Sequence, residues 1–580
     1  MNKNLIIWGG ILVAAAIFFQ FSNKLNTTRL SSNQQAMPYE DAVGELSKLL
    51  KTVNWGTNYV QRRAQVELGA KPDLKETLPS IDQYPITVEP GVSNQDVVAE
   101  IFVTTVRGWS PVVKGRTRTA DGRMVEVARA FNESNQKLSG GKGAKVRVRF
   151  IASGTGYQFI ASEKYMPDAF TPVHHLWIEM LKEHGIPTTM IRENMVTSAG
   201  GIVMKNEVAE RLRSTYGELD VKSIINEVVQ GNLAMGYTNP FASSTGLNFL
   251  MTTLSTFAEG DEQAMLSSAV VDTFQKFQQS VPFVALTTLQ MREAVRNDGS
   301  LDAFVMGHQT FLGTDSLQNG YEFIPFGVKH DHPLYAVGDP GAEKLEVLEL
   351  LATFAEKPEY KQLAKDYGWD QAITSSFTPN IPIPSGKTLI EAQQLWKEKK
   401  DAGRKIAAVF LSDVSGSMGG SRMAGVKKAL MAGSKFITAD NSIGLVLFSD
   451  QVEVVLPVKK FNLNHRASFV AAVQDMNSGG GTSMYDGVAV ALKLLTEEKE
   501  KDPSIKPMLF VLTDGETASG LSFTDLSPVI KGIKIPVYTI GYEANVGELK
   551  RLSVLVEAAS ISAGEGNVEY KIGSLLNAQM

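Results

Sequence analysis

The 580-residue chain contains no cysteine, which excludes disulfides, thiolate metal sites, cysteine nucleophiles and an acylated lipoprotein cysteine. It also lacks a strong excess of charge of either sign. A formal net charge of -5 argues against a general nucleic-acid binder, which needs a basic face to neutralise phosphates. What is present is an ordinary globular composition, with 43% hydrophobic and 21% charged residues. Together with the length, this composition predicts two to four folded domains.

Long apolar runs are missing except at the N-terminus, where Leu5 to Phe21 is almost entirely apolar. A helix of this length is at the short limit for crossing a bilayer. Because no small-x-small cleavage site follows the run, we expect an uncleaved signal-anchor, a transmembrane helix over residues 1–24. A cleaved signal and a buried core helix are the alternatives. Basic residues flank the run on both sides, so the sequence specifies its orientation only weakly.

Beyond the N-terminus the chain divides by composition and periodicity. Residues 25–94 are expected to form a polar stalk and a helical segment. From 95 to 385, strand-like and helix-like segments alternate, which predicts α/β architecture with mostly parallel sheets. A proline-rich break ends this region, and a linker helix is expected over 386–404. A second α/β unit is expected over 405–580.

Two helices are predicted outside the α/β regions. The first covers residues 37–68, where apolar side chains recur at helical spacing. The second is the linker helix, which carries Trp396 on an apolar face and follows a stiff, proline-rich approach. We expect this helix to hold the two α/β units in one arrangement. The alternative is that Trp396 packs on the second unit as an extra N-terminal helix.

Oxygen-bearing side chains follow the first apolar strand of the second α/β unit. The strand leads directly into Asp413, Ser415 and Ser417, whose alternate spacing allows three oxygens to converge. Ligands of open α/β sheets sit at such carboxyl ends of strands. Thr482, in a Gly-rich loop, and Asp514, after a later apolar strand, supply two further oxygens. Singly these residues would cap helices or shape turns. As a set they predict a site for Mg²⁺ or Mn²⁺, which prefer oxygen ligands.

This Asp-x-Ser-x-Ser pattern, with a later Thr and Asp, resembles the metal-ion-dependent adhesion site of von Willebrand factor A domains. The resemblance implies a doubly wound, Rossmann-like fold for the C-terminal unit. It also implies that Ser415, Ser417 and Thr482 contact the metal directly, and that Asp413 and Asp514 act directly or through water. A vacant coordination position would accept a carboxylate from a partner. Nothing in the motif supplies an activated nucleophile or a poised base, so we do not expect an enzyme.

Short segments of the middle region carry a second resemblance. Residues 150–156, Phe-Ile-Ala-Ser-Gly-Thr-Gly, lie between a predicted strand and a predicted helix, where backbone N–H groups suit an anion. With residues 165–170 and 233–246, they resemble type 2 periplasmic solute-binding proteins, especially those for small oxyanions. The resemblance implies two lobes with a ligand between them. The ligand contacts it implies are Ser153, Thr155, Ser243, Ser244 and Thr245. Alternatively, these residues cap helices on a scaffold that has lost transport.

The order of these parts resembles bacterial proteins described as substrate-binding and von Willebrand factor A domain-containing. We therefore expect a single-pass protein of the bacterial cell membrane, with the bulk of the chain extracytoplasmic and no nucleic-acid partner. It would bind a protein or glycan that supplies a carboxylate to the metal, and a small solute such as an oxyanion in the middle domain. One alternative is an assembly factor for a MoxR- or chelatase-type ATPase on the cytoplasmic side. Another is the solute receptor of a transporter.

Overall fold

The computed structural model describes most of the chain between residues 37 and 580. The predicted signal-anchor lies outside the described residues. No helix within the described part of the chain is long and apolar enough to cross a membrane. The longer described stretches are 37–66, 78–104, 122–281, 301–400, 404–515, 517–542, 547–556, 560–564 and 566–580.

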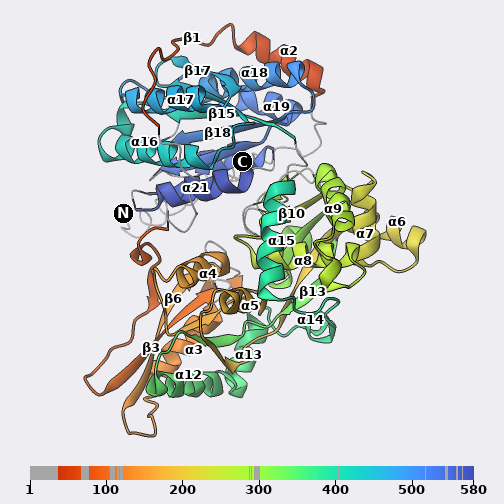
Figure 1. Ribbon diagram of the computed structural model, residues 1–580, viewed down its shortest axis with the longest axis vertical. Coiled ribbons are helices and arrows are strands. Elements are labelled where there is room, and N and C mark those ends of the chain that lie inside the picture. The colour runs from red at the N-terminus through yellow and green to blue at the C-terminus, as the bar shows by residue number, and fades with distance from the viewer. Residues whose placement is uncertain are drawn as a thin grey trace, which may run out of the picture.

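The C-terminal unit is built on a seven-stranded sheet with the order β1-β17-β16-β15-β18-β19-β20 (Figure 1). The central strand β15 pairs in parallel with β16 on one side and with β18 on the other, so three carboxyl ends lie at one edge. Hydrophobic side chains of β15 alternate between the cores on the two faces of the sheet. The strands are β1 (Trp55–Thr57), β17 (Val452–Lys460), β16 (Ser442–Phe448), β15 (Ile406–Asp413), β18 (Lys506–Thr513), β19 (Val537–Tyr542) and β20 (Ser560–Ala563).

Helices cover both faces of this sheet, as the predicted doubly wound architecture requires, and the α/β prediction is confirmed. One face carries α16 (Ser421–Gly433), α17 (Leu463–Asp475) and α21 (Val568–Gln579). The other face carries α2 (Tyr39–Leu49), α18 (Met484–Lys501), α19 (Phe523–Ile533) and α20 (Gly547–Val554).

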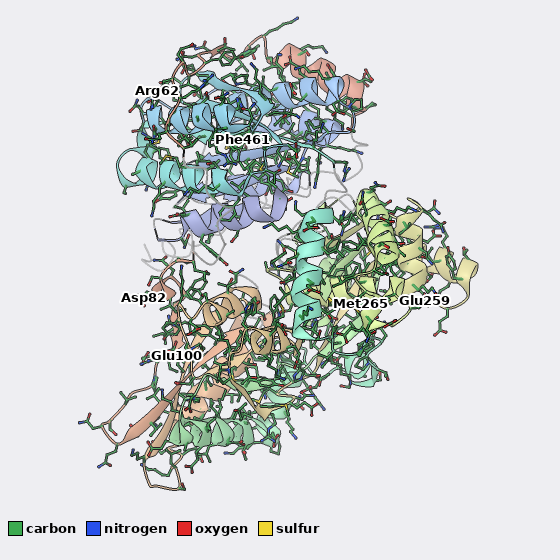
Figure 2. All side chains as sticks on the ribbon, viewed as in Figure 1. Arg62, Asp82, Glu100, Glu259, Met265 and Phe461 are labelled. Carbon is green, nitrogen blue, oxygen red and sulfur yellow. The ribbon has the colours of Figure 1, made fainter. Side chains whose placement is uncertain are left out.

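The segment before the middle domain is part of the C-terminal unit. Helix α2 packs against α19, and β1 adds a parallel edge strand to β17. Figure 2 shows Arg62 on this unit, where its guanidinium pairs with Asp475 at 2.6 Å. The helix expected over 37–68 therefore ends at Leu49. Asn54 and Gly56 are poor helix formers, and the edge of β17 offers backbone partners to an extended chain.

The middle domain consists of two lobes, each with its own sheet. The first lobe has a six-stranded sheet with the order β2-β6-β3-β7-β14-β8, and the second has a five-stranded sheet with the order β11-β10-β12-β9-β13. The chain passes between the lobes from β8 to β9 and from β13 to β14. The strands are β2 (Ile86–Val88), β3 (Asp96–Thr104), β6 (Gly143–Ile151), β7 (Ala169–Thr171), β8 (Thr188–Arg192), β9 (Ser198–Lys205), β10 (Met235–Thr238), β11 (Phe283–Ala285), β12 (Ala303–Gly307), β13 (Tyr321–His330) and β14 (Leu334–Val337).

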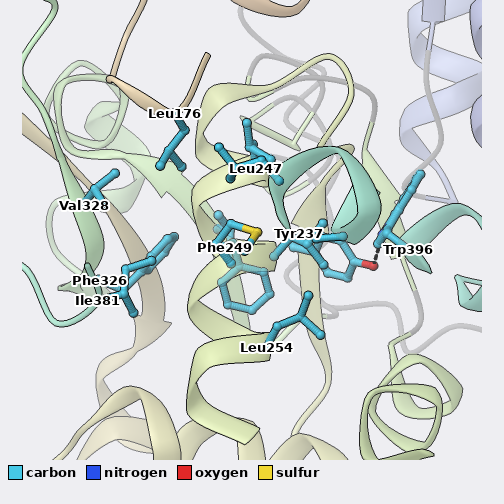
Figure 3. Close-up of a cluster of buried hydrophobic side chains, with 14 of the residues drawn as sticks. Leu176, Tyr237, Leu247, Phe249, Leu254, Phe326, Val328, Ile381 and Trp396 are labelled. Atoms are coloured by element: carbon cyan, nitrogen blue, oxygen red, sulfur yellow. Dashed lines mark hydrogen bonds between the residues drawn. The ribbon is translucent and has the colours of Figure 1, made fainter. Parts of the chain in front are cut away.

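Helices pack around both sheets of the middle domain. One hydrophobic core cluster contains side chains from both lobes, including Leu176 of the first lobe and Phe249 of the second (Figure 3). The helices of the first lobe are α3 (Gly122–Glu133), α4 (Ser153–Ala161), α5 (Leu176–Glu183), α12 (Ala342–Ala355) and α13 (Pro358–Asp366). Those of the second are α6 (Asn206–Tyr216), α7 (Val221–Val229), α8 (Ser244–Phe257), α9 (Ser268–Ser280), α11 (His308–Leu312) and α14 (Ala372–Ser376).

The expected linker helix, α15 (Gly386–Lys399), belongs to the middle domain (Figure 1). Trp396 is 1% exposed, and its Nε1 donates to the Tyr237 hydroxyl at 2.6 Å (Figure 3). Helix α15 also packs against α5 of the first lobe, where a Cβ on Gly386 would lie 2.2 Å from the Glu179 carbonyl oxygen. The clamp interpretation is wrong, and so is packing on the C-terminal unit. The apolar face of α15 finds its burial against the two lobes instead.

A small polar contact joins the two α/β units. Tyr570 of α21 donates its hydroxyl hydrogen to Gln158 Oε1 of α4 at 2.8 Å, and the same hydroxyl lies 3.4 Å from Thr155 Oγ1. The Tyr570 side chain also belongs to the core cluster of the middle domain. Helix α21 of the C-terminal unit, rather than α15, therefore provides this contact between the units.

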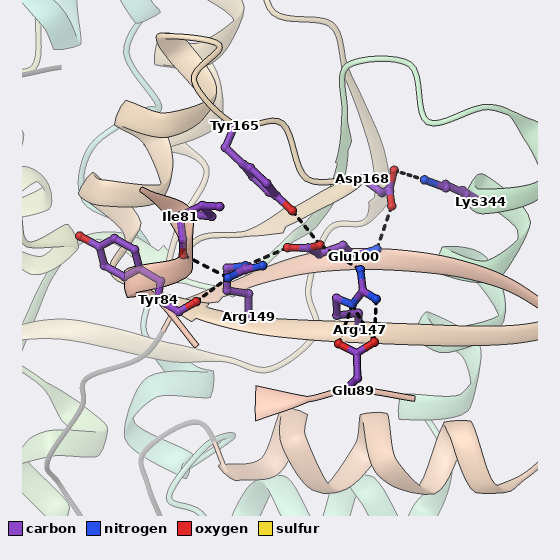
Figure 4. Close-up of polar contacts among 9 residues, drawn as sticks. All are labelled: Ile81, Tyr84, Glu89, Glu100, Arg147, Arg149, Tyr165, Asp168 and Lys344. Carbon is purple, nitrogen blue, oxygen red and sulfur yellow. Dashed lines mark hydrogen bonds and ion pairs between the residues drawn. The ribbon is translucent and has the colours of Figure 1, made fainter. Parts of the chain in front are cut away.

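Buried charges in the first lobe have a structural role. Glu100 accepts hydrogen bonds from Arg149 Nε and from the Tyr165 hydroxyl, each at 2.9 Å (Figure 4). Arg149 also donates to the carbonyl oxygens of Ile81 and Tyr84. Because the carboxylate and the guanidinium are paired within the protein, this network fixes the entering chain to the sheet and does not form a ligand site.

Candidate metal centre

The first predicted ligand lies where β15 ends. Asp413 is fully buried, and its Oδ1 accepts the Ser415 backbone N–H at 2.7 Å. Its Oδ2 accepts the Thr513 hydroxyl, which comes from the end of the neighbouring strand β18. The carboxylate is therefore held in one orientation by two loops. A buried aspartate held in this way is suited to support a cation site rather than to titrate freely.

A chain of hydrogen-bonded oxygens extends from this point to the loop after β18. The hydroxyls of Ser415 and Ser417 lie 3.0 Å apart, and Ser417 Oγ donates to Asp514 Oδ1 at 2.9 Å. The structure thus brings Asp413, Ser415, Ser417 and Asp514 together at one edge of the sheet. This follows from the parallel pairing of β15 with β18, which places both carboxyl ends side by side.

The loop that carries Thr482 docks on the same edge through its backbone. Gly416 N donates to Gly480 O at 3.0 Å, and Gly479 N donates to Val414 O at 2.8 Å. The Thr482 carbonyl in turn accepts the Ala518 N–H at 2.8 Å. Three loops therefore meet here, as the spacing of the five residues predicts. Within the described structure, the Thr482 hydroxyl makes no hydrogen bond with the other four residues.

Burial is the main electrostatic feature of this centre. Burial raises the pKa of Asp413, and the nearby Asp514 carboxylate acts in the same direction. Hydrogen bonds from Ser415 and Thr513 oppose this shift only in part. A divalent cation beside the two carboxylates would stabilise their charged forms. The geometry therefore favours cation binding on electrostatic grounds.

The chemistry of the donors fits a hard cation. The five predicted residues offer carboxylate and hydroxyl oxygens and no nitrogen or sulfur, which suits Mg²⁺ or Mn²⁺ better than Zn²⁺. Among the described residues, no three His, Asp or Glu side chains gather in a way that could hold a metal. Two of the five predicted residues are carboxylates and three are hydroxyl-bearing, so a cation held by them would complete its coordination with water or a partner's oxygen.

Sequence reasoning missed two side chains of this centre. Thr513 holds Asp413, and its place directly before Asp514 was the available signal. Arg422 donates to Asp514 Oδ2 at 2.7 Å and to the Ser417 carbonyl oxygen at 3.2 Å. Arg422 lies in the first turn of α16, where a positive charge is unfavourable to the helix, but the sequence carries no signal for its pairing with Asp514.

A hollow with a volume of ≈ 300 Å³ lies beside the first metal loop. It extends from Val414 over the ends of β16 and α17, so it is continuous with the edge that carries the predicted ligands. Its lining is mostly polar, and it offers room for side chains of a bound partner. The lining residues are Val414, Leu447, Ser449, Gln451, Glu453, Asp475, Asn477, Ser478 and Gly479.

The predicted solute contacts are in a different situation. Ser153 is buried, and its hydroxyl lies 2.8 Å from the Thr104 hydroxyl. Ser243 caps α8 by accepting the Gly246 N–H at 3.3 Å. Ser244 Oγ accepts the Trp177 indole N–H at 2.9 Å. These hydroxyls are engaged by the protein itself, as in the alternative in which they cap and position helices.

The two lobes also touch where a solute would lie. A Cβ on Gly154 of α4 would come within 2.2 Å of the Phe241 carbonyl oxygen of the second lobe. Thr245 is buried at the start of α8, and Thr155 lies beside Tyr570 of the C-terminal unit. The fold thus brings the predicted contacts of both lobes near one another, in an arrangement closed by protein atoms.

Comparison with known proteins finds a domain match around the candidate metal centre. Residues 408–572 match the von Willebrand factor type A domain. The chain is 28% identical over 147 residues to inter-alpha-trypsin inhibitor heavy chain H1 of Mesocricetus auratus, covering 23% of this chain and 16% of that protein. It is 27% identical over 151 residues to heavy chain H3 of Bos taurus, covering 24% and 17%. The chain therefore spans about one sixth of the length of these relatives.

Solved structures are similar to both parts of the chain. A periplasmic thiamin binding protein covers 54% of this chain and 99% of its own, with a TM-score of 0.37 and 11% identity. The sulfate-binding protein SubI from Mycobacterium tuberculosis covers 50% and 92%, with 0.32 and 14%. A von Willebrand factor type A protein from Catenulispora acidiphila covers 30% and 42%, with 0.27 and 19%. Such likenesses say nothing about the ligand. From the motif, the sheet order and the family match, residues 408–572 are a von Willebrand factor type A domain.

Proposed function

We propose that this protein is a binding protein whose C-terminal domain engages a partner through a divalent cation, Mg²⁺ or Mn²⁺. The cation would be held by Asp413, Ser415, Ser417, Thr482 and Asp514. The partner, a protein or a glycan, would supply a carboxylate to a free coordination position. The cation supplies charge attraction for that carboxylate, and the chain's own residues hold the cation and shape the surface around it.

One observation carries this proposal. The side chains of Ser415, Ser417 and Asp514 are linked by hydrogen bonds of 2.9 to 3.0 Å at the carboxyl edge of the sheet. Asp413 joins them by accepting the Ser415 backbone N–H at 2.7 Å, and Thr482 lies on a loop docked against this edge. The neighbouring hollow gives the partner a surface to contact. No side chain of this set forms the pair of nucleophile and base that acyl or phosphoryl transfer requires, which favours binding over catalysis.

Calorimetric titration of the full-length protein with Mg²⁺ tests the proposal. Removing the Asp413 carboxylate by Asp413→Ala should weaken Mg²⁺ binding by at least tenfold, or about 1.4 kcal/mol. The matched control is Asp440→Ala, which removes an exposed carboxylate just before β16, at the opposite edge of the sheet. Equal affinity in the parent and in Asp413→Ala would overturn the assignment of the site.

We propose further that the protein is anchored in the membrane by residues 1–24, with both folded units on the extracytoplasmic side. The apolar N-terminal run supports the membrane anchor. The likeness of the middle domain to periplasmic solute-binding proteins, which work outside the cytoplasm, supports the extracytoplasmic side. Deletion of residues 1–24 should release the protein from sedimented membranes. Protease digestion of intact cells should cleave the parent protein if the units face outward, and protection would favour the cytoplasmic assembly-factor alternative.

Binding of a small solute by the middle domain remains a prediction. A solute would reach Ser153 and Ser243 only if the lobes separate, since Gly154 now contacts the Phe241 carbonyl. Calorimetric titration with sulfate and with phosphate tests this directly. Heat of binding that disappears in Ser153→Ala would support a retained site. Its absence for both anions would favour a scaffold that no longer binds oxyanions.

A further inference from the structure

Arg422 is placed against the metal centre in a way that helix stability does not explain. It is the second residue of α16, and a positive charge in the first turn opposes the helix dipole. Its guanidinium instead lies 2.7 Å from Asp514 Oδ2 and 3.2 Å from the Ser417 carbonyl oxygen. The position of Arg422 is therefore determined by the metal loops rather than by its own helix.

The partners of Asp514 make this contact important. Its side chain is fully buried, with Oδ1 accepting from Ser417 and Oδ2 accepting from Arg422. The Arg422 side chain remains 36% exposed, so its guanidinium also faces solvent, from which a ligand can reach it. A buried carboxylate thus has a partly exposed counter-ion.

Charge repulsion links a bound cation to Arg422. The charges of Asp413 and Asp514 match those of one divalent cation, and Asp450 on the neighbouring loop adds a carboxylate that accepts the Gly481 N–H. A divalent cation held by Asp413 and Asp514 would lie close to the Arg422 guanidinium and repel it. That arrangement disfavours the cation alone and favours an anion that contacts both the cation and the guanidinium.

We propose that Arg422 is the resident counter-ion of the cation site. It pairs with Asp514 in the absence of a divalent cation and weakens binding of the cation alone. It then forms the second contact for the partner's carboxylate. This inference rests on the proposed function of the same site and adds its regulation. Cation and carboxylate reinforce each other's binding because each removes the charge that disfavours the other.

The test uses Mg²⁺ titration of the full-length protein at constant ionic strength. Arg422→Gln should tighten Mg²⁺ binding by about fivefold or more, because it removes a positive charge next to the cation. Arg422→Lys keeps the charge and should stay within about twofold of the parent. The control is Lys428→Gln, which removes an exposed charge from the same helix where it pairs with Glu569, and should change the affinity by less than about twofold.

A second measurement uses acetate as the carboxylate probe. Replacing chloride by acetate should tighten Mg²⁺ binding to the parent protein and to Lys428→Gln. The same replacement should have a smaller effect in Arg422→Gln, which lacks the second contact. A merely structural role for Arg422 would weaken Mg²⁺ binding in Arg422→Gln and leave the acetate effect unchanged, and this result would overturn the inference.

The outcomes separate this inference from the proposed function. If Asp413→Ala abolishes Mg²⁺ binding but Arg422→Gln binds no more tightly than the parent, the counter-ion role is wrong and the cation site stands. If the parent and all variants fail to bind Mg²⁺, both are wrong. Tight binding by Arg422→Gln alone would support the inference most strongly, since the parent would then be held in its cation-free state.

Discussion

The two α/β parts of this chain differ in how far their polar side chains at strand ends reach solvent. In the C-terminal domain, Asp413 and Ser415 are buried, but the predicted ligands lie at one edge of the sheet where Ser417 is exposed. In the middle domain, Ser153, Ser243 and Ser244 are buried and bonded to other protein groups. Similar residue types at the ends of similar strands therefore have different roles. What separates them is whether a second lobe covers the edge of the sheet.

The two parts also differ in which segment covers them from outside. Helix α15 packs on α5 of the first lobe and on α8 and α9 of the second. The helix therefore bridges the lobes, with the Trp396 indole hydrogen-bonded to Tyr237 (Figure 3). In the C-terminal domain the corresponding outer support is the segment around α2 and β1, which covers one face and one edge of the sheet and leaves the metal loops uncovered.

Removing Trp396 should have the largest effect. Because its indole is buried, Trp396→Ala should lower the free energy of unfolding of the middle domain by about 3–5 kcal/mol. Hydrogen exchange should accelerate in α8 and α15 and not in β15 or β18. The matched variant is Trp55→Ala at the edge of the C-terminal sheet, which should act on that domain alone. Faster exchange in the C-terminal domain of Trp396→Ala would restore the clamp interpretation.

The contribution of the N-terminal segment to the C-terminal domain can be tested in the same way. Leu46 of α2 is 2% exposed in the core beneath the sheet. Leu46→Ala should destabilise the C-terminal domain by about 2–5 kcal/mol. The control Leu463→Ala removes a side chain that is 47% exposed and should cost less than about 0.5 kcal/mol. Equal denaturation midpoints in the parent and Leu46→Ala would show that α2 contributes little.

Acid should lower the stability of the middle domain through its buried histidines. Burial lowers the pKa of His174 to about 4 and that of His332 to about 3, against an ordinary value of 6.5. Between each folded-state pKa and 6.5, the unfolded chain binds more protons than the folded chain. The stability that comes from these neutral histidines is therefore fully present above pH 6.5 and is lost as pH falls. For His174 alone the loss between pH 7 and pH 5 should be about 2 kcal/mol.

The measurement is denaturant unfolding of the middle domain at both pH values. His174→Gln should flatten the pH dependence, whereas His184→Gln, at an exposed position, should leave it unchanged. A middle domain equally stable at pH 7 and pH 5 would contradict the burial of His174. It would also weaken the contrast between a closed middle domain and an open metal edge.

The smallest effect is expected at the contact between the units. Tyr570→Phe removes the hydrogen bond to Gln158 and should cost about 1 kcal/mol of docking free energy. Proteolysis of α4 should become faster in this variant. The control Tyr538→Phe removes a hydroxyl that donates to Gln579 within the C-terminal domain, and should leave α4 protected. Unchanged cleavage in Tyr570→Phe would mean that other contacts hold the units together, among them the hydrogen bond from Asn567 Nδ2 to Gln83 Oε1 at 3.5 Å.

Much of the metal centre was readable from the sequence because its signals are local. An apolar run followed by Asp413, Ser415 and Ser417 predicts both the strand and the direction of its loop. Asp514 follows a second apolar strand in the same way. The pairing of Asp514 with Arg422 was not readable, because it depends on how α16 meets a loop about ninety residues away in the chain. Contacts of that kind carry no periodic or compositional signal.

The sequence by itself determined the α/β class, the strand ends that carry Asp413 and Asp514, and the helical character of the segment around Trp396. Periodicity and strand length are properties of consecutive residues, so they survive without knowledge of the partner surface. Only the tertiary structure decided where these faces are buried. It placed α15 on the two lobes, gave β1 to a sheet that begins hundreds of residues later, and set Tyr570 against α4. An apolar face predicts that a helix is buried. Which surface buries it depends on all the apolar surfaces of the folded chain that compete for it.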